Sequence, residues 1–222
     1  MRRSSLSRRD TAGRWLVLLG IAYPVLHHGG TIFAGLGDVG STETRWADWI
    51  DLLTPFAVTG AVAGAMRATG ATRPAWTGFW FGAVLYTLGH GIHLAANSVG
   101  NAAPGEPAHL WDERVGHYLW YAGFAVLVAA LAATVHDRPM RGGLLSYALA
   151  LLVGFTHFTN SVEGQTPVMG IAVAAGFAVW GFTSRHDLGR LLLVAYGFAL
   201  VLLIGFGVWQ HGFPEFSELG WI

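Results

Sequence analysis

Two histidines and an asparagine stand close together near the end of a long apolar stretch. His90, His93 and Asn97 are offset by zero, three and seven residues, so an α-helix places them on one face. Imidazole and amide groups on an apolar helix cost free energy unless something satisfies them. The spacing therefore predicts a polar site with the donor chemistry of a metal centre.

Further histidines fall at a similar depth in the neighbouring apolar stretches, at about 1.5 Å of rise per residue. The candidate metal ligands are His28, His90, His93, His117, His157 and His211. The preferred ligands are His90, His93, His117 and His157, and either His28 or His211 completes the set. Imidazole nitrogen suits zinc and non-haem iron, and imidazole-rich ligation also suits copper.

Carboxylates accompany these histidines. Glu113 shares a helix face with His117 at a spacing of four residues, and Asp112 precedes it. We predict that Glu113 is a metal ligand or general base and that Asp112 orients a histidine, which makes both candidate catalytic residues.

Three more polar residues are predicted to hydrogen-bond the ligating histidines: Asn97, Asn160 and Glu163. The competing interpretation is a polar layer that only holds helices together. In that case Asp112 and Glu113 are acids favoured by the dipole at a helix start, and Glu163 is a solvated loop residue.

The composition predicts the environment of the chain. Of its 222 residues 53% are hydrophobic and 12% are charged, whereas soluble domains carry about 25% charged residues. The net charge of zero provides no field to recruit nucleic acid. The absence of cysteine excludes disulfides and thiolate sites, and the absence of lysine excludes a retinal Schiff base.

Seven apolar stretches approach the length that crosses about 30 Å of hydrocarbon. They are Trp15–Phe33, Trp49–Met66, Trp76–Ser98, Glu113–Val135, Gly142–Asn160, Pro167–Thr183 and Leu188–Gln210. The expected fold class is an all-α integral membrane bundle of seven transmembrane helices. It comprises a basic, disordered tail (residues 1–13), the helical domain (14–212) and a short external segment (213–222).

The arginines predict the orientation of the bundle. If the N-terminus is cytoplasmic, every arginine except Arg45 and Arg114 falls on the inner side. This asymmetry matches the positive-inside rule and leaves the C-terminus outside. We therefore expect a multi-pass protein of the cell membrane, plasma or inner.

These observations favour a metal-dependent membrane enzyme with an outward-facing site. Its substrate is expected to be lipid-like or otherwise membrane-soluble, and hydrolysis is slightly favoured over oxidation. One alternative is a b-type haem electron-transfer protein in which His90 and His157 ligate the iron. Another is a transporter of a metal or small solute, although paired broken helices are not evident.

The expected partners follow from the same environment. Membrane lipid surrounds the helices, no nucleic acid is expected, and a homo-oligomer is possible. Small-residue faces such as Gly60-x-x-x-Gly64 and Gly78-x-x-x-Gly82 let helices approach closely, either within the chain or between copies.

Overall fold

The structure is a computed structural model that describes residues 2–42, 44–135, 143–184 and 186–221. These residues are helical without any strand; Asp38 and Arg45 form one isolated bridge. The prediction of an all-α fold is confirmed. The long helices are α1 (Arg2–His27), α4 (Thr54–Thr69), α5 (Arg73–Ala102), α7 (His117–Val135), α8 (Leu144–Glu163), α9 (Pro167–Thr183) and α10 (Asp187–Trp209).

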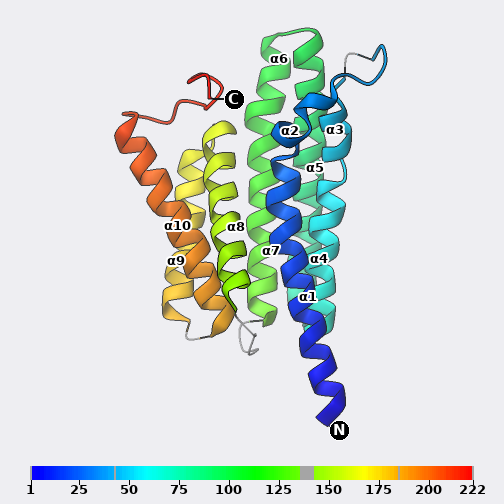
Figure 1. Cartoon of the computed structure of the whole chain (residues 1–222), viewed down its shortest axis with the longest axis vertical. Coiled ribbons are helices and arrows are strands. Elements are labelled where there is room, and N and C mark those ends of the chain that lie inside the picture. The colour runs from blue at the N-terminus through cyan, green and yellow to red at the C-terminus, as the bar shows by residue number, and fades with distance from the viewer. Residues whose placement is uncertain (1, 43, 136–142, 185, 222) are drawn as a thin grey trace.

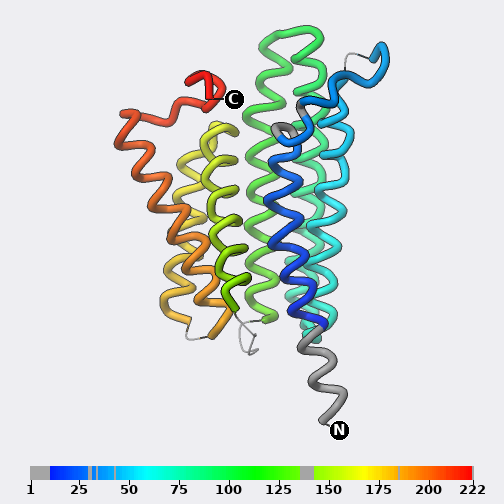
Figure 2. Tube along the Cα trace, in the orientation of Figure 1, coloured from blue at the N-terminus to red at the C-terminus, as the bar shows by residue number. Residues whose placement is uncertain are grey.

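Successive long helices run in opposite directions, so the two termini lie at opposite ends of the bundle (Figures 1 and 2). The short elements gather at the end away from the N-terminus (Figure 1). They are α2 (Gly29–Ile32), η1 (Ala34–Leu36), α3 (Trp46–Asp51), α6 (Glu106–His109) and the π-helix η2 (Leu110–Gly116). We call this the α6 end.

Three helical segments are long and apolar enough to cross a membrane: Trp46–Thr69, Glu106–Val135 and Asp187–Trp209. The helix Pro167–Thr183 is apolar but shorter. A membrane protein is therefore possible from the length and composition of the helices alone.

The first helix differs from its predicted bounds at both ends. It begins at Arg2, so most of the segment expected as a disordered tail is part of α1. No glycine or proline precedes Gly13 to interrupt a helix, which explains the difference. At its other end, α1 stops at His27, and a single further turn forms α2.

The second predicted stretch is broken in two. α3 ends at Asp51 and α4 begins at Thr54, with Pro55 in its first turn. Proline has no backbone N–H, so residue 55 cannot donate the helical hydrogen bond to the carbonyl of Asp51. The break therefore leaves that carbonyl free at the α6 end.

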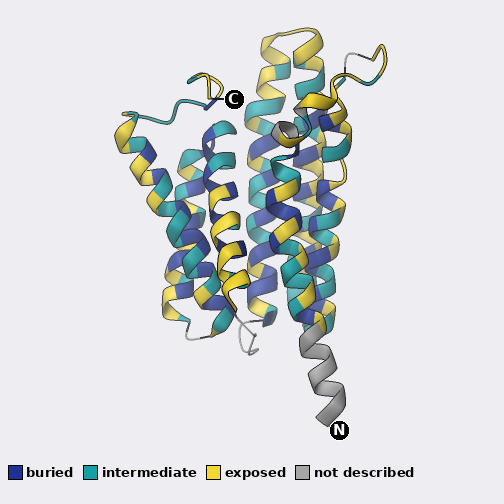
Figure 3. Cartoon of the chain, in the orientation of Figure 1, coloured by how far each residue is buried: buried dark blue, intermediate teal, exposed yellow. Residues whose placement is uncertain are grey.

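The helices pack as two groups. α1, α4, α5 and α7 contact one another, α10 packs against α8 and α9, and α1 joins the groups through α8. Tyr23, Tyr86 and Tyr196 are fully buried in the core between them. Exposed residues lie on the outer faces of several helices (Figure 3). They include large apolar side chains such as Phe81 on α5 and Phe155 on α8.

A close helix contact joins α5 to η2 and α7 through glycines spaced seven residues apart, Gly82 and Gly89 on α5 and Gly116 and Gly123 on the other two. Gly89 abuts the backbone of Trp120, and Gly123 abuts that of Tyr86. A methyl group added at Gly116 would lie 3.0 Å from the Cα atom of His93. Side chains that flank these glycines on the two helices are therefore forced into contact.

Candidate metal centre

Three adjacent elements, α5, η2 and α7, supply the residues of the centre. His90 and His93 come from α5, while Asp112 and Glu113 lie in η2 and His117 is the first residue of α7. A π-helix pairs residues five apart, so η2 brings Asp112 to the face of His117. π-Helical turns of this kind occur frequently at functional sites.

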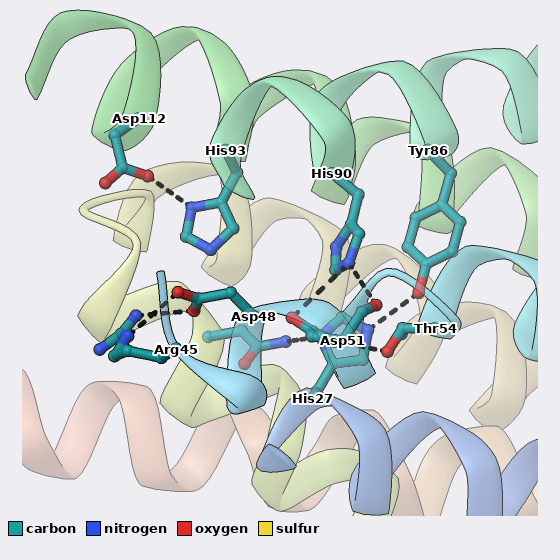
Figure 4. A network of polar contacts seen from close by, with 10 residues as sticks. His27, Arg45, Asp48, Asp51, Thr54, Tyr86, His90, His93 and Asp112 are labelled. Carbon is teal, nitrogen blue, oxygen red and sulfur yellow. Dashed lines mark hydrogen bonds and ion pairs between the residues drawn. The ribbon is translucent and has the colours of Figure 1, made fainter. Parts of the chain in front are cut away.

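Each of two histidines is fastened through Nδ1 to an acidic residue. His93 Nδ1 lies 2.5 Å from Asp112 Oδ1 (Figure 4). His117 Nδ1 lies 3.3 Å from the carbonyl oxygen of Glu113 and 3.2 Å from its Oε2. Because these oxygens only accept hydrogen bonds when the acids are ionised, both Nδ1 atoms carry the proton and donate. The lone pair of each histidine is therefore on Nε2.

The two imidazoles lie close enough to share a ligand. Their ring centroids are 4.4 Å apart, and one ligand atom from each of His93, Asp112 and His117 lies within 4.8 Å of the others. The side chains of His93, Asp112 and His117 are 17%, 13% and 6% exposed. The cluster is thus largely buried but reaches the surface on one side.

His90 lies one helical turn deeper and is held by the break between α3 and α4. Its Nε2 donates to the free carbonyl of Asp51 at 3.0 Å and lies 3.6 Å from Asp51 Oδ2 (Figure 4). Nδ1 of His90 is therefore an acceptor, and it is buried without a hydrogen-bond partner. Oε2 of Glu113 is also buried without a partner of hydrogen-bonding geometry. Such atoms call for a ligand or a water molecule.

Trp120 connects the histidines beneath the cluster. The rings of His90 and His93 contact it at centroid distances of 4.4 and 5.0 Å, and His27 stacks on it at 4.8 Å. His27 also bonds Tyr86 Oη through Nε2 at 2.9 Å. A continuous file of polar and aromatic side chains thus extends from the cluster toward the bundle interior.

The structure places three predicted ligands elsewhere. His157 Nε2 donates to the carbonyl of Gly170 at 2.9 Å, and its ring meets Tyr196. His28 Nε2 lies 3.3 Å from Thr156 Oγ1. His211 follows α10, is exposed and has a positive φ of 54°. Among the described contacts none joins His157 to His90, the pair suggested for a haem.

The three residues predicted to hydrogen-bond the ligating histidines also lie apart from one another. Asn160 Nδ2 donates to His27 Nδ1 at 3.0 Å and so reaches the histidine file. Asn97 instead accepts from Asn101, one turn further along α5. Glu163 accepts from the backbone N–H of Phe216 at 2.8 Å and so fastens the C-terminal segment to α8.

Sequence reasoning missed His27, Asp51 and the π-helix. Asp51 has a readable signal, because a proline four residues later frees its carbonyl. His27 and His28 face directions about 100° apart, and either one satisfied the predicted depth. The seven-residue glycine spacing of α5 and α7 was a second overlooked signal, since it fixes the contact that joins His93 to His117.

Comparison of the chain with protein-family models, curated proteins and solved structures gave no match. The class of protein is therefore defined by the fold and the cluster alone. It is a helical bundle with three helices able to cross a membrane, and it carries a histidine–aspartate cluster with the composition of a metal site.

Proposed function

We propose that the chain is a membrane-embedded, metal-dependent enzyme whose site lies near the outer face of the cell membrane. His93 and His117 hold one divalent transition metal through Nε2, with zinc or iron preferred to copper. The substrate is lipid-like or otherwise membrane-soluble. Hydrolysis is favoured over oxidation, because Glu113 places a carboxylate beside the histidines where it can accept a proton from water.

The membrane part of the proposal extends to all seven long helices. Three of them have the required length and hydropathy, and the others present large apolar side chains on their outer faces. Their alternating directions put Arg14, Arg67 and Arg190 at one end of the bundle and Arg45 and Arg114 at the other (Figure 1). This division supports an α6 end on the outer side.

The depth of the cluster supports a membrane-soluble substrate. His93 lies nine residues before the end of α5, which corresponds to about 14 Å along the helix. A reactive group carried by a molecule within the outer leaflet can reach this depth without leaving the membrane. The partial exposure of His93 and Asp112 provides the opening through which it would approach.

One observation carries the proposal: Nδ1 of His93 and of His117 are both held by an acidic residue, which leaves both Nε2 lone pairs available. Metal-bound histidines almost always donate a hydrogen bond from their other ring nitrogen to a carboxylate, a carbonyl or water. Two imidazole ligands with positions open for water or a further protein ligand are compatible with a catalytic zinc or non-haem iron site.

The roles of the surrounding residues follow from their contacts. A bound metal would act as a Lewis acid and lower the pKa of a coordinated water. Asp112 orients His93, and Glu113 orients His117 through its carbonyl oxygen. Oε2 of Glu113 is buried without a hydrogen bond and can serve as a proton acceptor. His90 presents the lone pair of Nδ1 to the same region, where it can bind the metal or accept a hydrogen bond from a reactant.

Elemental analysis of protein purified in mild detergent tests the proposal. We expect about one transition-metal ion per chain, and a clearly lower content in His93→Ala and His117→Ala because each removes a ligand. His211→Asn is the matched control, since it removes an exposed histidine and asparagine tolerates the positive φ there. Metal content that is unchanged in both ligand variants, or absent from the wild type, contradicts the proposal.

A further inference from the structure

A single guanidinium group stands beside the cluster. Arg45 precedes α3, and in Figure 4 its pair with Asp48 lies next to His93. Hydrogen bonds to Asp48 raise the pKa of Arg45, and the negative charge of Asp112 acts on it in the same direction. Arg45 therefore lies within electrostatic range of the metal-binding cluster.

The guanidinium is fixed on one edge and free on the other. Nε donates to Asp48 Oδ2 at 3.1 Å and Nη2 donates to Asp48 Oδ1 at 2.7 Å, which is a bidentate pair. Nη1 has no hydrogen-bond partner among the described residues. Asp48 is 10% exposed, whereas Arg45 is 47% exposed, so the guanidinium of Arg45 is accessible from solvent.

The backbone around Arg45 fixes it as well. Arg45 forms the isolated bridge with Asp38, and its carbonyl accepts from Asp48 and Trp49 at the start of α3. An arginine whose rotamer is already restrained loses little conformational freedom when its remaining N–H groups bind a ligand.

We propose that Arg45 binds an oxyanion of the substrate, a phosphate or carboxylate group, while the neighbouring metal holds the reacting atoms. This inference rests on the proposed function and gives the lipid-like substrate an anionic head. Planar N–H groups match two oxygens of such a group, and charge-assisted hydrogen bonds to it are strong. Arg114 lies in η2 on the exposed surface and has no comparable restraint.

The test uses protein loaded with Co²⁺, whose visible spectrum reports on anions that approach the metal. Wild-type protein in lipid-free detergent is titrated with inorganic phosphate and, separately, with acetate. We expect Arg45→Gln to weaken binding of at least one anion by about tenfold or more. Arg45→Lys keeps the charge without the planar fork and should give an intermediate loss, while Arg114→Gln should change affinity by less than about twofold.

A second measurement identifies the source of the anion. Nanodiscs of phosphatidylcholine are compared with nanodiscs that also contain phosphatidic acid. Competition by phosphatidic acid assigns the oxyanion to a lipid headgroup, and its absence assigns it to a soluble anion; both results support Arg45 as the recognition group.

Two outcomes overturn the inference: no spectral response of the wild type to either anion, or equal affinities in wild type and Arg45→Gln. Failure of the proposed function is distinguishable, because the protein would then bind no Co²⁺ at all. An unchanged Co²⁺ spectrum before anion is added shows that Arg45→Gln has left the cluster intact.

Discussion

At the scale of single residues, the histidines of the cluster differ in what holds them. His93 and His117 donate from Nδ1 to acidic residues, whereas His157 donates from Nε2 to the backbone carbonyl of Gly170 in α9. No described hydrogen bond involves Nε2 of the first two, whereas the Nε2 of His157 is bonded across helices. Depth along a helix, the criterion available from sequence, does not distinguish the two.

The orienting role of Asp112 gives a prediction at this scale. Asp112→Asn keeps the size of the side chain but removes the charge that holds the Nδ1 proton of His93. We expect the affinity for the metal to fall by about 10- to 100-fold, measured by competition with a chelating dye. Glu106→Gln, which changes an exposed acid in α6, should leave the affinity within about twofold. Equal affinities in wild type and Asp112→Asn would show that the carboxylate is only a helix-start acid.

At the scale of elements, the sequence predicts helices better than their interruptions. All seven apolar stretches correspond to long helices, because hydrophobic length is a strong signal. The break between α3 and α4 and the π-helical turn of η2 were not predicted. Both depend on individual backbone hydrogen bonds, which average apolar patterns do not report.

These interruptions are what assemble the site. The break at Pro55 frees the carbonyl of Asp51, which accepts a hydrogen bond from His90. The π-helix η2 brings Asp112 to the same face as His117. The close contact of α5 and α7 then brings His93 to the same place. The structure brings together His90, His93, His117, Asp112 and Glu113, which sequence reasoning grouped, because they lie on neighbouring helical elements. It places His28, His157 and His211 elsewhere, since tertiary contacts decide where their rings point.

At the scale of the whole molecule, the helices pack as two groups, and the cluster belongs to the first of them. The cluster lies on α5, η2 and α7, in the half of the bundle that also contains α1 and α4, while Asn160 of α8 bonds His27 in the histidine file. The C-terminal segment folds back onto α8 through Glu163 and the buried Phe216. The three C-terminal helices therefore support the histidine file from one side and supply none of the cluster's donors.

The proposed orientation predicts which ends are accessible from outside the cell. The chain has no cysteine, so single cysteines report their own positions. We expect Ser41→Cys and Ser217→Cys to react in intact cells with a membrane-impermeant maleimide, and Thr72→Cys to react only after permeabilisation. All three are exposed, so differences in burial do not explain the pattern. Rapid labelling of Thr72→Cys in intact cells would reverse or refute the proposed topology.

X-ray absorption at the edge of the bound metal tests the central claim most directly, namely that Nε2 of His93 and Nε2 of His117 hold one metal ion. The account predicts at least two imidazole ligands at about 2.0–2.1 Å if the metal is zinc, and one fewer in His93→Ala. A metal surrounded only by oxygen ligands, or an imidazole count that stays the same in His93→Ala, would contradict it.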